Sequence, residues 1–161
     1  MVKLQFYTEE DFPLVNYELD ESQSQYTSSA ANALKRIADR NTGLEFPVTI
    51  FHNGIPRGFF TLDFGEDRLE LTGNRNSVLL RSLSIDPGQQ GKGIGKATML
   101  LVDDFVRENF RDCHEIVLAV NKNNIFAYEL YLKAGYLYEG RIRMGRSGPQ
   151  YLMSKCIQAN E

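Results

Sequence analysis

The feature that most constrains the fold is a glycine-rich segment at residues 89–97, whose sequence is QQGKGIGKA. It follows an apolar run with strand character, residues 78–85, and leads into a helix-like run from Ile94 to about Phe110. Closely spaced glycines at a strand-to-helix junction let the backbone turn tightly and expose its N–H groups. The first turn of the helix adds partial positive charge. The segment therefore predicts a binding site for a phosphate or pyrophosphate group.

Two common phosphate-binding motifs do not fit this segment. A P-loop would need Gly in place of Gln90 and Ser or Thr in place of Ala97, and without that hydroxyl there is no Mg²⁺ ligand. The dinucleotide fingerprint GxGxxG would need Gly in place of Lys96 or of Thr98. The pattern that remains is QxxGxG at residues 90–95.

A second motif lies further along the chain. Residues 124–136, NIFAYELYLKAGY, match NxxAxxLYxKxG[FY] at every defined position, and the strand-like residues 114–120 lie between the two motifs. Together, in this order, they resemble the signature of the GNAT superfamily of acyl-CoA-dependent N-acetyltransferases. The resemblance is strong over residues 77–136 and weak in the flanks. It implies that the phosphorylated ligand is acetyl-CoA.

Hydrophobic patterning predicts the remaining elements. The predicted strands are residues 3–7, 46–52, 57–64, 78–85, 114–120, 136–144 and 150–156. One predicted helix begins at Thr8, and three more cover residues 28–40, 94–110 and 124–134. Asn53-Gly54 is a strong hairpin signal, and the strand–helix–strand crossover places its two strands parallel. We expect one GNAT domain over residues 1–161, of the α/β (α+β) class. Its mixed, mostly antiparallel twisted sheet would be flanked by helices, with a splayed central parallel strand pair.

Composition limits the function classes. The chain is 42% hydrophobic and 24% charged, as is usual for a globular protein, and no apolar run is long enough to span a membrane. Its net charge of -3 argues against general nucleic-acid binding. Its two cysteines, Cys113 and Cys156, and its two histidines lack the spacing of a metal site. We therefore expect a cytoplasmic protein with no nucleic-acid partner, no membrane partner and no metal.

The resemblance implies which residues hold the cofactor. The N–H groups that bind the pyrophosphate would come from Gln90, Gly91, Lys92, Gly93, Ile94, Gly95 and Lys96. In this fold the preceding strand carries a bulge, and backbone groups of Leu83, Ser84 and Ile85 pair with the pantetheine arm. Asn124 would hold the same arm, although capping of the following helix explains it as well. From the residues alone, a tight turn without a ligand and an ordinary central strand both stay open.

The resemblance also implies two catalytic groups. The N–H of Leu83 would face the acetyl carbonyl as an oxyanion donor, and the phenol of Tyr131 would protonate the departing CoA thiolate. A thiol pKa of about 8.5 and a phenol pKa of about 10 make that transfer plausible. The alternative is that Tyr131 is a core residue, because Ala127 and Ala134 share its helical face.

The general base is unassigned. Many family members carry Glu four residues before the oxyanion donor, where this chain has Leu79. Arg81 points to the same side by strand alternation and cannot act as a base. It would bind a carboxylate or phosphate of the substrate, or else form an ion pair with Asp63, Glu70 or Glu115.

The acceptor site is expected in the first half of the chain. Residues 21–26, ESQSQY, resemble bacterial polyamine acetyltransferases, so Glu21 and Tyr26 join Arg81 as predicted substrate-binding residues. The other interpretation of this segment is a solvated polar loop. Glu18 and Asp20 lie beside it and add acidic charge that would suit a cationic amine.

These observations predict an acetyl-CoA-dependent N-acetyltransferase that moves an acetyl group to a primary amine. Direct attack in a ternary complex is expected, because neither cysteine lies in a recognisable nucleophile setting. The acceptor would be a small amine such as a polyamine, with a peptide amine second. The alternative is a non-catalytic CoA-binding regulatory module on the same fold. The family resemblance also implies a possible homodimer.

Overall fold

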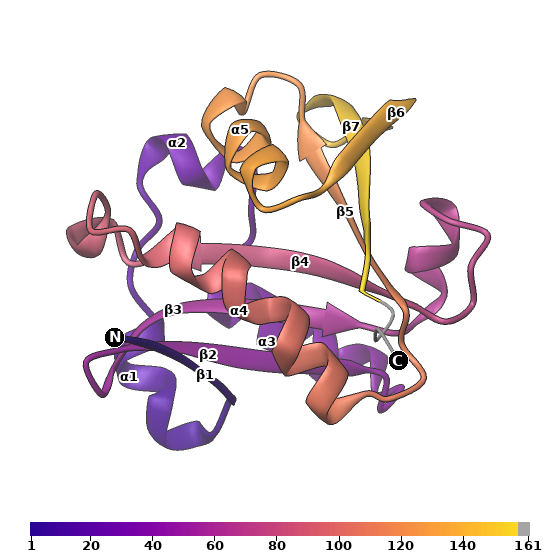
Figure 1. Cartoon of the computed structure of the whole chain (residues 1–161). Helices are drawn as coiled ribbons and strands as arrows, with labels where there is room; N and C mark the ends of the chain where they lie inside the picture. Colours follow the sequence, from indigo (N-terminus) through magenta and orange to yellow (C-terminus); the bar gives the residue numbers. More distant parts are fainter. Residues whose placement is uncertain (158–161) are drawn as a thin grey trace.

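The computed structural model describes residues 1–157, which form one seven-stranded sheet covered by helices (Figure 1). The strand order is β1-β2-β3-β4-β5-β7-β6. The strands are β1 (Val2–Phe6), β2 (Glu45–His52), β3 (Ile55–Asp63), β4 (Ser77–Ile85), β5 (Glu115–Asn121), β6 (Leu137–Gly145) and β7 (Gly148–Cys156). The helices are α1 (Phe12–Val15), α2 (Glu21–Ser24), α3 (Ala30–Arg40), α4 (Ile94–Asn109) and α5 (Ile125–Lys133), with 3₁₀ turns η1 (Glu9–Asp11), η2 (Glu66–Glu70) and η3 (Pro87–Gln89).

The predicted fold class is confirmed, including the parallel strand pair at its centre. Among the described strands only β4 and β5 pair in parallel, and their ladder ends after three residue pairs, at Leu79 and Val117. Beyond that point the two strands diverge. The register between β3 and β4 also shifts between Phe59 and Thr61, and Ser82 opposite has a positive φ of 59°. This is the predicted bulge, and it lies where the strands separate.

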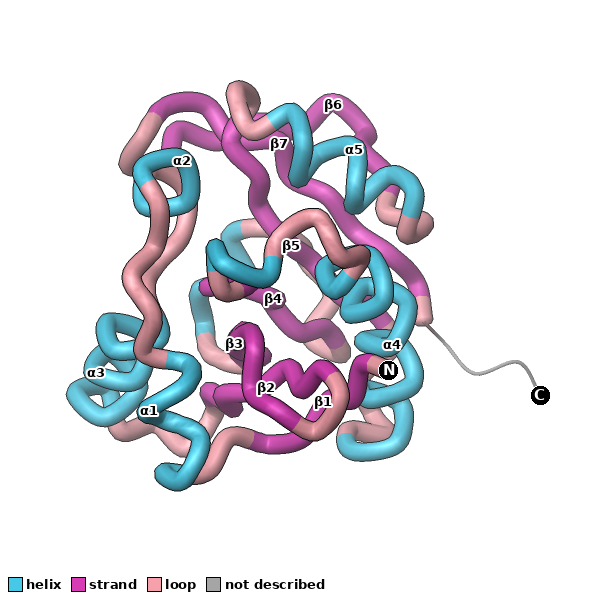
Figure 2. The backbone as a smooth tube through the Cα atoms, turned by 90° about the vertical axis from the view of Figure 1, so that its left-hand side faces the viewer, coloured by secondary structure: helices cyan, strands magenta, loops and turns pink. Residues whose placement is uncertain are grey.

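The helices cover both faces of the sheet, which explains why β3 and β4 are largely buried (Figure 2). On one face α4 packs over the main core, to which Phe60 contributes. On the other face α1 and α3 pack near β3, where Phe59 contacts a smaller cluster with Val15 and Ala33. The side chains of these two neighbouring residues of β3 thus point to opposite faces of the sheet, because side chains alternate along a strand.

Several local expectations differ from the structure. The helix expected from Thr8 is only a short turn followed by α1, because Asn16 ends it. Hydrophobic patterning did not predict helix α2, and Asp20 caps it by accepting a hydrogen bond from the N–H of Gln23 at 2.7 Å. Helix α3 ends at Asn41, which takes the left-handed conformation that commonly terminates a helix. No helix among residues 1–157 is long and apolar enough to cross a membrane.

Candidate functional site

The turn before α4 presents free backbone N–H groups. Gly91 and Gly93 have φ values of 81° and 78°, and a Cβ at either would meet no atom within 4 Å. These glycines are therefore needed for their conformation and not for lack of room. The first intrahelical hydrogen bond runs from the N–H of Ala97 to the carbonyl of Gly93, at 3.0 Å. The N–H groups of residues 94–96 are left without helical partners, as at the start of any helix.

A cleft of about 640 Å³ joins this turn to the end of β4 and the start of α5. Its dimensions and its free N–H groups suit a ligand with a pyrophosphate and a long arm. Of the twelve residues predicted to bind the cofactor, eleven line the cleft: Leu83, Ser84, Ile85, Gln90, Gly91, Gly93, Ile94, Gly95, Lys96, Asn124 and Tyr131. Lys92 does not line it, because its ammonium group turns aside to Gln89 Oε1 at 2.9 Å.

The gap between β4 and β5 exposes backbone groups of β4 to this cleft. The N–H of Asp86 donates to Arg57 on the β3 side. Backbone groups alternate along a strand, so those of Ile85 face the gap. The carbonyl of Ile85 accepts a hydrogen bond from Gln23 Nε2 of α2 at 2.8 Å. On the other side Tyr17 donates from its hydroxyl to the carbonyl of Ser84 at 3.0 Å.

Tyr131 lies at the wall of the cleft and Asn124 caps the helix that carries it. The Tyr131 side chain is 8% exposed. Burial raises its pKa to about 12, so the phenol stays protonated at physiological pH. Asn124 accepts a hydrogen bond from the N–H of Ala127 at 3.4 Å, so its capping role is confirmed.

A second cavity of about 320 Å³ opens beside the cleft. Its walls come from the loop after α2, the middle of β4, the end of β5 and the β6–β7 hairpin. Five residues line both spaces: Tyr26, Thr27, Leu80, Arg81 and Ser82. The two cavities therefore meet at the bulge of β4, and a molecule in one can reach a molecule in the other.

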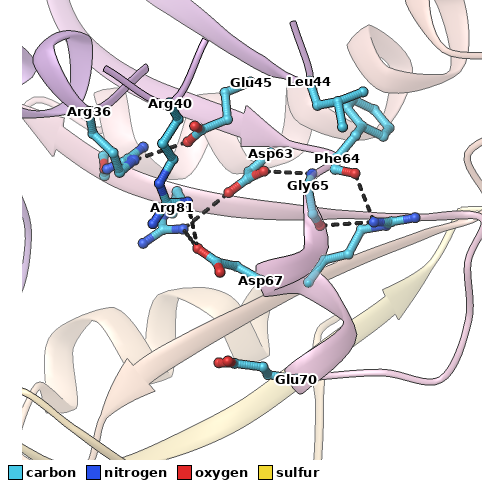
Figure 3. Close-up of polar contacts among 12 residues, drawn as sticks. Arg36, Arg40, Leu44, Glu45, Asp63, Phe64, Gly65, Asp67, Glu70 and Arg81 are labelled. Atoms are coloured by element: carbon cyan, nitrogen blue, oxygen red, sulfur yellow. Dashed lines mark hydrogen bonds and ion pairs between the residues drawn. The ribbon is translucent and has the colours of Figure 1, made fainter. Parts of the chain in front are cut away.

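Arg81, which lines both cavities, belongs to a network of charged side chains (Figure 3). Its Nη1 lies 3.1 Å from Asp63 Oδ2 and 2.8 Å from Asp67 Oδ2. Asp67 also pairs with Arg40 at 2.8 Å, and these two guanidinium groups hold the pKa of Asp67 below its usual range. The predicted partner Asp63 is thus confirmed, whereas Asp67 was missed. Glu70 and Glu115 were wrong as partners, because Glu70 pairs with Arg143 and Glu115 accepts from Thr72.

The described residues place few carboxylates at the two cavities. Leu79, at the position where many relatives carry Glu, is buried in an apolar cluster. Among the described residues that line either space, Asp20 is the one acidic residue, and one of its oxygens caps α2. Tyr26, one of the predicted substrate-binding residues, lines both cavities. Glu21 is exposed at the start of α2 and lines neither.

Comparison with known proteins identifies the family. The model of the acetyltransferase (GNAT) family matches residues 7–136. The chain is 38% identical over 157 residues to an uncharacterized N-acetyltransferase, YbbJ, of Bacillus subtilis (strain 168). The alignment covers 94% of this chain and 95% of that protein. It is 31% identical over 101 residues to the spermine/spermidine N(1)-acetyltransferase of the same strain, covering 60% and 62%.

Solved structures show the same fold. The spermidine N-acetyltransferase of Vibrio cholerae, in complex with CoA and spermine, superposes with a TM-score of 0.70 at 19% identity, over 96% of this chain and 95% of that one. The aminoglycoside acetyltransferase AAC(6')-Ib in complex with coenzyme A gives 0.76 at 18% identity, over 97% and 95%. This chain belongs to the GNAT acetyltransferase family. It is accordingly an N-acetyltransferase that uses acetyl-CoA as its acetyl donor, and not the non-catalytic module.

Proposed function

We propose that this enzyme acetylates the primary amine of a small molecule that binds in the second cavity, by direct attack on acetyl-CoA bound in the cleft. The observation that carries the proposal is the junction of the two cavities at the β4 bulge, beside Leu83. A cavity of about 320 Å³ lies at the small end of ligand sites, which favours a small amine over a peptide amine. The amine acceptors named for relatives, spermine and spermidine, support the reaction type.

The cofactor side relies on backbone groups. The free N–H groups at the start of α4 bind the pyrophosphate, with the helix dipole adding favourable charge. The cleft-facing groups of Leu83 and Ile85 pair with the pantetheine arm, and Asn124 borders it. When bound, acetyl-CoA supplies an acetyl group activated as a thioester.

Two groups of the chain act on the reacting atoms in this proposal. The N–H of Leu83 donates to the acetyl oxygen, where negative charge develops. Tyr131 gives its proton to the departing thiolate. Its pKa of about 12 makes the phenol a weaker acid than an exposed one. The thiolate leaves inside the same cleft, however, and burial raises the pKa of a thiol for the same reason, so the two groups stay comparable.

The amine must lose its proton before it attacks. Bringing an amine of pKa about 10 to its neutral form at pH 7 costs about 4 kcal/mol. Leu79 offers no base on β4, and Asp20 already accepts a hydrogen bond from the backbone of α2. We therefore assign this proton to water in the second cavity, which is open to solvent.

Two further properties belong to the proposal. The described part of the chain has two free thiols, Cys113 and Cys156, which fits a reducing compartment and hence the cytoplasm. Exposed apolar side chains on β6, namely Leu137, Ile142 and Met144, would suit a homodimer contact. Sedimentation of the protein across a range of concentrations tests the dimer.

The function is tested by thiol release. The enzyme is supplied with acetyl-CoA and a panel of amines that contains polyamines, amino acids, aminoglycosides and short peptides. We expect amine-dependent release of CoA and a mass increase of one acetyl group on a small amine. Tight acetyl-CoA binding with no release for any amine would overturn the proposal.

A further inference from the structure

We propose that the acceptor carries an oxyanion, a carboxylate or a phosphate, near its reactive amine, and that Arg143 and Arg146 bind this oxyanion. The inference rests on the proposed function, because it concerns the substrate of the second cavity. It departs from the polyamine acceptors that the names of the relatives and the segment at residues 21–26 suggest.

Among residues 1–157, the charges that line the second cavity are all positive. Arg81, Arg143 and Arg146 line it, and none of the lining residues in this described part of the chain is Asp or Glu. A polyamine carries several positive charges and would find no carboxylate there to neutralise them. A molecule that pairs its amine with an oxyanion would instead meet guanidinium groups, the side chains best suited to bind it.

The three arginines differ in how much charge they can offer. Arg81 already pairs with Asp63 and Asp67, so its charge is compensated inside the fold. Within the described residues, the ion pair of Arg143 is with Glu70, at 3.1 Å, and the Glu70 side chain is 67% exposed. An ion pair this open to water contributes little, so a ligand can compete for Arg143. Arg146 is exposed, and no ion pair involving it occurs within residues 1–157.

The hairpin that carries both arginines is fixed against the rest of the cavity. Ser147 donates from its hydroxyl to the carbonyl of Gln25 at 2.7 Å, and Asn121 donates to the carbonyl of Ser147 at 2.9 Å. Gln150 orients Arg143 by accepting from its Nε at 2.8 Å. The guanidinium of Arg143 is therefore positioned before any ligand arrives, which reduces the entropy lost on binding.

The site lies opposite the cofactor with respect to the bulge. The cavity touches the cleft at Arg81 and Ser82, and Leu83 follows directly in the cleft. An acceptor held by Arg143 and Arg146 at the far wall can extend its amine toward that junction. The oxyanion and the amine then occupy the two ends of one small molecule.

The experiment uses matched amines with the full-length enzyme and saturating acetyl-CoA. The pairs are 4-aminobutanoate against 1,4-diaminobutane, and O-phosphoethanolamine against ethanolamine, with spermidine added. We expect kcat/KM to be at least about tenfold higher for the oxyanion member, since each charge-assisted hydrogen bond is worth about a factor of ten or more. The two pairs separate a carboxylate from a phosphate as the preferred group.

Variants locate the effect. Arg146→Gln and Arg143→Gln should each raise KM for the preferred oxyanion amine about tenfold and leave KM for acetyl-CoA unchanged. Arg141→Gln is the matched control, because Arg141 is exposed on the same strand and does not line the cavity. Spermidine used as well as the oxyanion amines, with no effect of Arg146→Gln, would overturn the inference and leave the proposed function intact.

A binding measurement keeps the two failures apart. Calorimetry on the CoA-saturated enzyme titrates O-phosphoethanolamine and 4-aminobutanoate without turnover. Binding that weakens about tenfold in Arg146→Gln but not in Arg141→Gln supports the inference even if turnover is absent. Turnover of cationic amines with no binding of either oxyanion amine overturns it. Failure of every amine in turnover and in binding removes the proposed function and the inference together.

Discussion

The cofactor cleft and the acceptor cavity are adjacent, but different parts of the chain and different chemical groups form them. The cleft is lined mainly by one continuous strand–turn–helix segment, whose free backbone N–H groups face it, and residues around α2 and on α5 complete its walls. The cavity is formed by side chains from four segments that lie far apart in the sequence. A backbone site depends on conformation and tolerates changes of side chain. A side-chain site depends on residue identity, so one cofactor site can be kept while the acceptor changes.

The largest expected effect comes from changing the conformation of the cleft. Gly93→Val places a β-branched residue at a φ of 78°, which such residues avoid, so the turn must rearrange. We expect the variant to lose the stabilisation of about 2.7 kcal/mol that acetyl-CoA at 100 times its Kd confers on the unchanged protein. Thermal unfolding with and without acetyl-CoA measures it.

Gly43→Val is the control for that experiment. Gly43 has a φ of 73° and open space around its Cα, but it lies in the loop after α3 and lines neither cavity. It should lower the melting temperature through the same backbone strain and retain the acetyl-CoA shift. An equal loss of the shift in both variants would show that the effect is general destabilisation.

The next largest effect is expected from Tyr131, the proposed proton donor to the departing thiolate. Tyr131→Phe keeps the ring that packs in the core and removes the proton donor. We expect kcat to fall on the order of 10²-fold with little change in acetyl-CoA affinity. Steady-state kinetics and calorimetry measure both quantities. An unchanged kcat with a lower melting temperature would make Tyr131 a packing residue.

Tyr136→Phe is the matched control, because Tyr136 is buried nearby and lies outside the cleft. Its hydroxyl has no hydrogen-bond partner among residues 1–157, so its removal should leave kcat unchanged and cost little stability.

The pH profile should show the raised pKa of Tyr131. A general acid acts only while it is protonated, and the pKa of this phenol is about 12, above its usual value of 10. We expect kcat/KM to rise about tenfold per pH unit while the amine loses its proton, with no alkaline decrease from Tyr131 below about pH 11. Rates measured between pH 6 and 10.5 at fixed ionic strength test this. A decrease that begins near pH 9 would show that the general acid has a pKa well below that expected for the buried Tyr131 phenol.

Arg81 is expected to matter more for stability than for acceptor choice. Removing it leaves the carboxylate of Asp63, which is 1% exposed, without its ion-pair partner. We expect Arg81→Ala to lower the free energy of unfolding by about 2 kcal/mol, below the usual cost for a fully buried pair because Arg81 is 28% exposed. Urea unfolding measures the loss. A tenfold rise in acceptor KM without destabilisation would instead make Arg81 an acceptor-binding residue.

The smallest effect should come from the contact between α2 and β4. Gln23→Ala frees the carbonyl of Ile85, which we expect the pantetheine arm to use. Acetyl-CoA should then bind about two- to tenfold more tightly, the equivalent of one net hydrogen bond. Calorimetry compares this variant with Gln25→Ala, whose side chain is exposed on the same segment. Weaker binding in Gln23→Ala alone would show that Gln23 itself contacts the cofactor.

The sequence could predict the cofactor side because its signals are local. The glycine pattern, the strand before it and the motif around Tyr131 each lie within a short stretch, and the structure brings them together as expected. The acceptor side depends on contacts between distant segments. Gln23 and Ile85 are 62 residues apart in the sequence, and Ser147 and Gln25 are 122 residues apart, so no local sequence pattern predicts either contact. For the same reason the sequence predicts only a strand at Arg143 and a connection between strands at Arg146, and gives neither residue a role at the site.

The hydrogen bond from Gln23 to Ile85 has a thermodynamic consequence. If the pantetheine arm takes the Ile85 carbonyl, Gln23 must release it, and α2 is then free to shift. The residues that follow α2, Gln25 and Tyr26, line the acceptor cavity. Occupation of one site thus changes the wall of the other, which is a coupling free energy between two ligands. Linkage is reciprocal, so whatever factor acetyl-CoA imposes on acceptor affinity through this one amide group, the acceptor imposes on acetyl-CoA affinity.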